Sequence, residues 1–462
     1  MNKSGFGRRD FLKGLGVASL MPLGGFESFG IQGKSYHNSR NFLIINAHII
    51  SMDKSIGNLK VGDVLIENGQ ISRIGERLTS ENEVEVIDAK GMVLLPGFVE
   101  THWHVWTGLF RSMSVKPPGK GYFETQQEVG PHFTPEDMKV ACELAGAEAI
   151  DSGITTLHNW CHNVRSFEHA VASLEGLETS GIRARYSFGN AVGRGSEEPI
   201  DFAPLEKLES DWRKYDHSGL FELGFAWRGI EGSIETGSYD YRRAREMGLP
   251  ISTHSSRAGV IGRLSKAGLL DENLQLIHGM QATDWEIEAM VGAGSPISIS
   301  PFSELRIGYG FPEMIKLLDK GATVGLSVDT TTISGNADMF AIMKNILNIT
   351  NAKAQDEFKI CAERVLEMAT IEGAKSLGID EITGSITPGK QADLILIDPN
   401  ALNLVPFTSP VDILVEAGQP RNVSMVMVNG RVLKKEGKLQ QQNPSDVIAR
   451  ANATFERIKS KV

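Results

Sequence analysis

The sequence contains few cysteines, and they lack the spacing of a disulfide framework or of a thiolate metal site. The 462 residues include three cysteines, Cys142, Cys161 and Cys361, and no two of them form a CxxC pair. We interpret all three as small buried side chains. A disulfide-rich scaffold and a cysteine-ligated zinc site are therefore not indicated.

An excess of positive charge and long apolar runs are also absent. The chain has 47 Lys and Arg against 57 Asp and Glu, which gives a formal net charge of −10. This balance argues against binding a polyanion over a broad face, so we expect no nucleic-acid partner. After the first thirty residues, no stretch reaches about 18 uninterrupted apolar residues, so the mature protein should not span a membrane. We expect a small-molecule substrate as the partner, and a homo-oligomer is compatible with this composition.

The first thirty residues differ in composition from the rest of the chain. The stretch GRRDFLKGLGVASLMPLGG joins a basic start, with Arg8 and Arg9, to an apolar run too short to cross a bilayer. The arginine pair followed by Phe11 and Leu12 resembles a twin-arginine export signal, which predicts a periplasmic protein. The alternative is a disordered basic tail on a cytoplasmic protein, because no clear A-x-A cleavage site follows. We assign residues 1–35 to the signal and a linker.

Both ends of the remaining chain have the pattern of a small β domain. Residues 40–94 and 382–445 alternate short apolar runs with turns, and the Asn-Gly pairs at 68–69 and 429–430 are strong hairpin signals. A chain of this length needs more than one small core. One accessory β-sandwich built from both ends is simpler than two separate domains, and we expect a C-terminal helix over 446–462.

Residues 95–381 alternate strands and helices. Eight apolar or β-branched runs predict strands covered on both faces: MVLLPGFVETH, ITTLHN, IRARYSFGN, FELGFAWRG, PISTHSS, LQLIHG, PISISP and TVGLSVDT. The clearest helix has Thr134 as N-cap, Pro135 at its first position and Gly153 past its end. Eight strand and helix units predict an α/β fold, a (β/α)8 TIM barrel. An open doubly wound sheet is the alternative, but no Gly-rich phosphate loop follows the first strand.

Two histidines one residue apart end the first barrel strand, in PGFVETHWH. Side chains on a strand alternate faces, so His102 and His104 point the same way, at the mouth where active sites of this fold lie. Three more ionisable residues stand at strand ends, His254, His278 and Asp329. Each alone is more simply explained as a satisfied buried histidine or a helix N-cap. Five at one end of one barrel indicate a metal site, because buried ionisable groups are costly unless they are paired or metal-bound.

The chain resembles the amidohydrolase superfamily over nearly all of residues 42–440. The motifs that carry the resemblance are PGFVETHWH, SGITTLHNW, the lone His254, LIHG, GLSVDTTTISGNADMF and GSITPGKQADLILID. Within the superfamily, SELRIGYGFPEMIKLLDKGATVGLSVD is similar to the mononuclear deaminases and triazine chlorohydrolases, the cytosine deaminase-like branch.

The resemblance implies one divalent metal ion held by His102, His104, His254 and Asp329. His278 would orient a bound water and help to deprotonate it. Three imidazoles and one carboxylate suit Zn²⁺ best, or Fe²⁺, and would lower the pKa of that water towards about 7. Asp329 would then take a proton and pass it to the leaving group. The fourth strand, GFAWRG, has no lysine for carboxylation, so a second metal ion is not expected.

The fifth strand departs from the deaminase pattern. The branch usually has H-x-x-E there, and the Glu protonates a ring nitrogen of the substrate, but this sequence has Arg257 in that position. Ordinary nucleobase deamination is therefore in doubt. Glu304, in SPFSELRIG, is a candidate replacement for the acid, or Arg257 binds an anionic substrate group through its planar fork. A structural ion pair between the two is the third option.

Further side chains are candidates for the substrate pocket. The second strand, TLHNWCHN, brings His158, Trp160 and His162 to the mouth, which predicts an aromatic-lined pocket with extra hydrogen-bond donors. Strand alternation lets only some of them face inward, so His158 alternatively packs behind the barrel. Trp106 is either another pocket wall or a packed aromatic of its loop. Arg228, at the end of the fourth strand, is also expected to bind substrate.

These features together predict a metal-dependent hydrolase. The expected reaction is cleavage of a C–N bond by deamination, or displacement of a substituent, on a cyclic or heteroaromatic small molecule. Hydrolysis of a cyclic amide or a peptide-like bond is the enzymatic alternative, and ammonia release separates the two. A non-catalytic metal- or ligand-binding protein is the third reading. His278 and Asp329 argue against it, because a structural site needs neither a water activator nor an open position.

Overall fold

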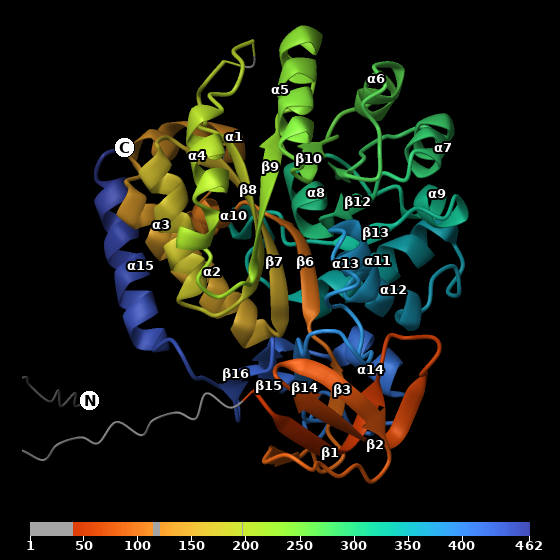
Figure 1. Ribbon diagram of the computed structural model, residues 1–462. Coiled ribbons are helices and arrows are strands. Elements are labelled where there is room, and N and C mark those ends of the chain that lie inside the picture. The colour runs from red at the N-terminus through yellow and green to blue at the C-terminus, as the bar shows by residue number, and fades with distance from the viewer. Residues whose placement is uncertain (1–39, 114–120, 196) are drawn as a thin grey trace, which may run out of the picture. The chain divides into compact units, whose positions relative to one another are not determined.

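The computed structural model describes residues 40–113, 121–195 and 197–462 (Figure 1). The expected export signal lies outside these ranges. The described part of the chain contains a parallel eight-stranded sheet in the order β13-β12-β11-β10-β9-β8-β7-β6. Its strands are β6 Phe98–Trp103, β7 Ile154–Val164, β8 Arg183–Asn190, β9 Phe221–Trp227, β10 Ile251–His254, β11 Leu274–Ile277, β12 Ile297–Ile299 and β13 Val324–Leu326.

The last of these strands lies beside the first. The Thr101 hydroxyl donates to the Leu326 carbonyl at 2.9 Å. Just beyond β13, the Asp329 amide donates to the His102 carbonyl at 2.8 Å, and the His104 amide donates to the Asp329 carbonyl at 2.6 Å. The predicted TIM barrel is therefore confirmed, and its closing contacts include residues expected to bind the metal.

Helices cover the outside of the barrel between successive strands (Figure 1). Thr134 caps α2 through the Asp137 amide, and Gly153 ends this helix with a left-handed backbone (φ 93°), as its sequence predicted. No helix in the described ranges combines the length and apolar character required to cross a membrane. The helices of the barrel region are α1 Tyr122–Val129, α2 Pro135–Ser152, α3 Phe167–Glu178, α4 Ala203–Ser210, α5 Ile234–Glu246, α6 Val260–Lys266, α7 Asp284–Gly292, α8 Pro301–Ile307, α9 Met314–Asp319, α10 Thr331–Ser334, α11 Met339–Ala354, α12 Ala362–Met368 and α13 Ile371–Ser376.

Both chain ends contribute to a second, nine-stranded sheet. Its order is β17-β16-β15-β14-β5-β1-β2-β3, and β4 pairs with β1. Asn68-Gly69 and Asn429-Gly430 have positive φ values and form its two predicted hairpin turns. The sheet encloses an apolar cluster of its own, so it forms a small β domain. Its strands are β1 Phe42–Ile50, β2 Asn58–Glu67, β3 Gln70–Gly75, β4 Glu85–Asp88, β5 Val93–Pro96, β14 Leu394–Ile397, β15 Val423–Val428, β16 Arg431–Lys435 and β17 Lys438–Leu439.

The stretch expected to form the first barrel strand is divided between the two sheets. Val93–Pro96 (β5) pairs with β1 and β14, whereas Phe98–Trp103 (β6) belongs to the barrel. Gly97 makes the transition, and a Cβ at this position would lie 2.1 Å from the Thr155 side chain. The β domain therefore adjoins the N-terminal ends of the barrel strands. There the Arg183 guanidinium donates to the Asp393 carboxylate at 2.7 Å.

Two further helices accompany the C-terminal part of the β domain, one between β14 and β15 and one after β17. These are α14 Pro410–Ala417 and α15 Pro444–Lys459. Ion pairs join α15 to α2: the Arg450 guanidinium lies 2.9 Å from the buried Glu143 carboxylate, and Arg457 contacts Asp137. The C-terminal helix is thus packed on the barrel and begins two residues before the range expected from sequence.

Candidate metal centre and active site

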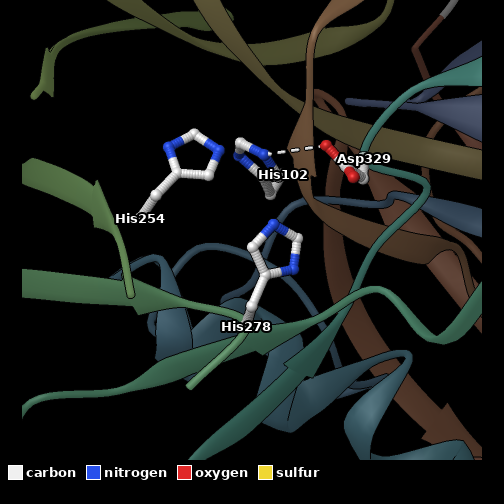
Figure 2. A group of neighbouring side chains, drawn as sticks. All are labelled: His102, His254, His278 and Asp329. Carbon is white, nitrogen blue, oxygen red and sulfur yellow. Dashed lines mark ion pairs between the residues drawn. The ribbon is translucent and has the colours of Figure 1, made fainter. Parts of the chain in front are cut away.

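Side chains from four strand ends converge at the C-terminal mouth of the barrel. His102 comes from β6 and His254 from β10, whereas His278 directly follows β11 and Asp329 lies three residues after the end of β13. One nitrogen or oxygen atom of each lies within 4.8 Å of the corresponding atoms of the others. Figure 2 shows the three imidazoles and the carboxylate turned toward one another. Such a group is able to hold a metal ion.

The spacing of the potential ligand atoms fits one tetrahedral ion. The Asp329 Oδ1 atom lies 3.3 Å from His102 Nε2 and 3.4 Å from His104 Nε2. His104 Nε2 is in turn 3.2 Å from His254 Nε2. Nitrogen and oxygen ligands at about 2.1 Å from a tetrahedral Zn²⁺ lie about 3.4 Å apart. Three of the distances among the four residues expected from sequence are therefore at ligand spacing, and the candidate ligand atoms of His102, His254 and Asp329 lie within 4.8 Å of one another.

Hydrogen bonding also leaves these imidazoles available as ligands. Neither ring nitrogen of the fully buried His102 has a hydrogen-bond partner among the described residues. His104 directs its Nδ1 atom to the Trp160 carbonyl at 3.2 Å, which leaves Nε2 for the centre. An unpartnered buried nitrogen is costly unless a ligand or ion satisfies it. The residues present thus fit a divalent ion.

Burial keeps the three candidate ligand histidines neutral. It lowers the pKa of His102, His104 and His254 well below the usual range, and the charges of neighbouring imidazoles lower it further. Neutral imidazole is the form that binds a metal ion. The surroundings of these three imidazoles therefore favour their neutral form, which is the form that binds a metal ion.

The buried carboxyl group of Glu100 holds together the strand ends that carry these candidate ligands. Glu100 is fully buried and accepts hydrogen bonds from the amides of His102 at 2.9 Å, Val328 at 3.1 Å and His158 at 3.3 Å. Burial raises the pKa of Glu100 to about 8. The sequence analysis missed this residue, although an acidic side chain inside an apolar strand, two positions before a ligand, is a signal that could have identified it.

His278 forms a hydrogen bond with Glu304, the residue that the sequence analysis offered as a replacement acid. His278 Nδ1 lies 3.0 Å from Glu304 Oε1, which also accepts from the Ser300 amide at 2.8 Å. Burial acts to lower the pKa of His278, but the hydrogen bond to Glu304 and the charge of Asp329 raise it overall. Glu304 is completely buried, and its Oε1 atom faces His278 and the Ser300 amide, while its Oε2 atom has no hydrogen-bond partner among the described residues. It is a positioning residue for His278.

His278 and Asp329 share a second unusual feature, a left-handed backbone. Their φ values are 74° and 61°, which residues other than glycine seldom adopt. Backbone hydrogen bonds hold both positions: the His278 amide donates to the Ser298 carbonyl at 2.8 Å, and Asp329 is held by β6 as described above. This conformation turns both side chains from the strand ends into the mouth, where strain is typical of functional residues.

A cavity of about 380 Å³ opens beside the histidines, a size suited to a small ligand. A larger groove, of about 790 Å³, lies along α2 and α15 and contains none of the site histidines. Four of the expected substrate-binding residues line the smaller cavity: Trp160, His162, Arg228 and Arg257. Its other lining residues are His104, Tyr122, Phe123, Gln126, Gln127, Asn190, Val192, Gly193, Arg194, Ala226, Glu231, His254, Ser256 and Tyr309.

His158 does not reach this cavity, so its expected substrate-binding role is wrong. Its Nδ1 atom lies 2.8 Å from the Thr101 carbonyl, and its Nε2 atom lies 2.7 Å from the Ser187 hydroxyl. The ring is fully buried, and burial lowers its pKa to about 3. His158 is a satisfied core histidine, the alternative that strand alternation left open.

Trp106 also lies outside the lining of the cavity. Its ring packs edge to face on Phe133, and its Nε1 donates to His162 Nδ1 at 3.3 Å. The expected wall residue therefore acts through His162 instead of touching the cavity. Burial lowers the pKa of His162 to about 4, which keeps this imidazole neutral and able to accept.

The two arginines expected at the mouth have different surroundings. Arg228 is half-buried and donates to the carbonyls of Ala191, Arg194 and Gly195 at 3.0 to 3.1 Å, so it holds the loop after β8. Arg257 is exposed at the rim. No ion pair joins Arg257 to Glu304 in the part of the chain that the structure describes, because Glu304 faces His278 instead.

The sequence analysis missed the contribution of α1 to the cavity. Tyr122 and Gln126, one helical turn apart, are both buried and both line it. Their spacing in YFETQQEV is a helical signal, but without neighbouring elements it does not show which cavity the face borders.

The chain is similar in sequence to known hydrolases along most of its length. The profile of the Amidohydrolase family matches residues 93–433. The 5'-deoxyadenosine deaminase of Methanosarcina mazei is 28% identical over 454 residues, which cover 91% of this chain and 99% of the relative. The 5-methylthioadenosine/S-adenosylhomocysteine deaminase of Syntrophobacter fumaroxidans is 27% identical and covers 91% of this chain and 98% of its own.

Solved structures show the same fold. An adenosine deaminase from Xanthomonas campestris with bound zinc superimposes with a TM-score of 0.80 at 23% identity, over 91% of this chain and 99% of that chain. The atrazine chlorohydrolase of Arthrobacter aurescens complexed with zinc gives a TM-score of 0.77 at 21% identity, over 90% of this chain and 100% of that chain.

Proposed function

The chain belongs to the amidohydrolase family, and on this premise we propose that it hydrolyses a bond between a ring carbon and an amino or other leaving group in a small heterocycle. The observation that carries the proposal is the ligand spacing of 3.2 to 3.4 Å among His104, His254 and Asp329, directly beside a cavity lined by Trp160. Relatives named as deaminases support the class of reaction.

The donor set of three imidazoles and one carboxylate favours Zn²⁺ over Fe²⁺ as the ion. When bound, it supplies a Lewis acid that lowers the pKa of a water molecule towards about 7. Asp329 accepts a proton in the reaction and returns it to the leaving group. His278, whose ring is fixed by Glu304, points its free nitrogen at the centre and orients the water. Trp160 provides a flat apolar wall for the heterocycle.

A direct test combines metal analysis with a panel of probes. We expect about one zinc ion per chain, and release of ammonia from adenosine or 5'-deoxyadenosine, or of chloride from a chlorinated triazine. Hydantoin serves as the cyclic amide of the panel. Ring opening of hydantoin without activity on the other probes would favour a cyclic amidase. A zinc-loaded protein inactive on every probe would contradict the proposal.

The position of Arg257 supports a substrate with an anionic substituent. This exposed arginine stands at the cavity rim where the deaminase pattern has a Glu. We expect Arg257→Gln to raise KM for a carboxylated probe by about 10- to 100-fold, with kcat nearly unchanged, because a charge-assisted hydrogen bond is lost. Steady-state kinetics of carboxylated and uncharged probes measure this effect.

The matched control is Arg243→Gln on α5. Arg243 forms ion pairs with Glu206 and Glu246 and does not line the cavity, so this variant should keep wild-type KM for both probes. An equal increase of KM for charged and uncharged probes in the Arg257→Gln variant would exclude anion recognition.

We propose further that the protein is exported to the periplasm through its twin-arginine stretch. The double substitution Arg8→Lys and Arg9→Lys is expected to retain the protein in the cytoplasm, because the arginine pair is the recognised feature of such signals. Fractionation of cells followed by immunoblotting checks this, with Arg73→Lys in the β domain as the control. Equal periplasmic amounts of wild type and the double variant would rule the proposal out.

A further inference from the structure

Two buried side chains of α1 line the cavity and each carries a polar atom without a hydrogen-bond partner in the described part of the chain. Tyr122 and Gln126 are each 8% exposed. The Tyr122 hydroxyl and the Gln126 amide nitrogen have no hydrogen-bond partner among the described residues, and they are the two lining side chains with such an atom. Burying an unsatisfied polar group is costly, so these atoms are expected to meet a ligand group.

A chain of hydrogen bonds determines the direction in which these groups donate. The indole nitrogen of Trp106 can only donate, and its partner is His162 Nδ1 at 3.3 Å. His162 therefore carries its proton on Nε2, which donates to the Gln126 carbonyl oxygen at 3.1 Å. With this oxygen occupied, the amide group of Gln126 turns its nitrogen away from His162.

The Tyr122 hydroxyl lies next in this series. It lies near the side chains of Gln126 and Thr330. The amide nitrogen of Gln126 is a donor and cannot accept the hydroxyl hydrogen, so this hydrogen is available to a ligand in the cavity. Burial raises the pKa of Tyr122 well above its usual value, and the charge of Asp329 raises it further, so the phenol stays protonated.

We propose that the Tyr122 hydroxyl donates a hydrogen bond to the substrate atom that gains negative charge when the neighbouring ring carbon is attacked. This inference rests on the proposed function. It assigns to Tyr122 the charge stabilisation that a strand-five carboxylic acid would supply, and Arg257 occupies that position in this chain. The phenol keeps its proton throughout, so the step adds and removes no atom.

The proposal narrows the class of substrate. The reacting carbon must neighbour a hydrogen-bond acceptor, either a ring nitrogen or a carbonyl oxygen, because Tyr122 and Gln126 both present donors. Tyr309 is the nearest competitor for this role, since it also lines the cavity and its ring centroid lies 5.9 Å from that of His278. The Tyr309 hydroxyl lies near the Ser256 side chain, as the Tyr122 hydroxyl lies near those of Gln126 and Thr330, so the kinetics of the two variants decide between them.

The decisive variant is Tyr122→Phe, which removes one oxygen atom. We expect kcat to fall by about 100- to 1000-fold, with KM and zinc content nearly unchanged, because a donor to developing charge is lost. Tm should stay equal or rise, because the variant removes an unsatisfied buried hydroxyl. A merely structural role for Tyr122 predicts the opposite, a lower Tm with unchanged kcat.

The chain offers a matched control in Tyr186→Phe. The Tyr186 hydroxyl is also buried and without a partner among the described residues, but it lies in the hydrophobic core and not at the cavity. We expect wild-type kcat and a similar change in Tm. Tyr309→Phe is measured alongside and should reduce kcat less than Tyr122→Phe.

Each result separates the inference from the function on which it rests. Wild-type kcat in the Tyr122→Phe variant, or a larger loss in Tyr309→Phe, overturns the inference while the proposed function stands. A zinc-loaded wild-type protein that hydrolyses none of adenosine, 5'-deoxyadenosine and a chlorinated triazine overturns both.

Discussion

Replacing Asp329 with Asn is expected to lower kcat by about 1000-fold. Asp329 Oδ1 lies 3.3 to 3.4 Å from the Nε2 atoms of two histidines, and the carboxylate is also the group that takes up the proton. The amide of Asn is a weaker ligand and accepts no proton at neutral pH. Single-turnover kinetics with the best probe of the panel, together with zinc content, measure the loss.

The control for this variant is Asp338→Asn. Asp338 caps α11 by accepting from the Ala341 amide at 3.0 Å, and Asn is an equally good N-cap. Its substitution should leave kcat and Tm close to wild type. If Asp329→Asn retained kcat within tenfold while keeping its zinc, the carboxylate would not be the proton acceptor.

Removal of the metal ion is expected to abolish turnover and to destabilise the fold. An ion that binds the folded state alone raises the free energy of unfolding by about 4 kcal/mol at a free concentration about 1000 times its Kd. Chelation should therefore lower Tm of the wild-type protein, and added Zn²⁺ should restore both Tm and activity. Calorimetry and activity assays before and after dialysis against a chelator test this expectation.

Two histidine variants show whether the ion lies where the side chains converge. His102→Ala should lose both the zinc and the sensitivity of Tm to chelator, because neither nitrogen of this buried ring has a hydrogen-bond partner among the described residues. His217→Ala removes an exposed imidazole that pairs with Glu178, and it should respond to chelator as the wild type does. An equal response of Tm in both variants would place the ion elsewhere.

The elements of the barrel could be predicted from the sequence because their signals are local. The cap residues Thr134 and Gly153 act within a few residues of the helix that they end, and strand alternation alone placed His102 and His104 on one side. The convergence of the ligands followed from the fold, because all strands of a TIM barrel present their C-terminal ends at one mouth.

The environment of each side chain was harder to predict than its position. Glu304 was correctly associated with the site, but only the packing of α8 shows that its Oε1 atom contacts His278. Trp106 and His158 were expected in the cavity and instead satisfy hydrogen bonds behind it. Such distinctions depend on contacts between residues 26 to 57 positions apart, which local periodicity does not encode.

The pairing of β5 with β14 has a consequence for synthesis of the chain. Val93–Pro96 is completely buried, and one of its two edges is covered only by Leu394–Ile397. While the ribosome makes the intervening 300 or so residues, this edge of apolar side chains stays open, and such edges promote aggregation of incomplete chains. The β domain can therefore complete its sheet only after Leu394–Ile397 has emerged from the ribosome.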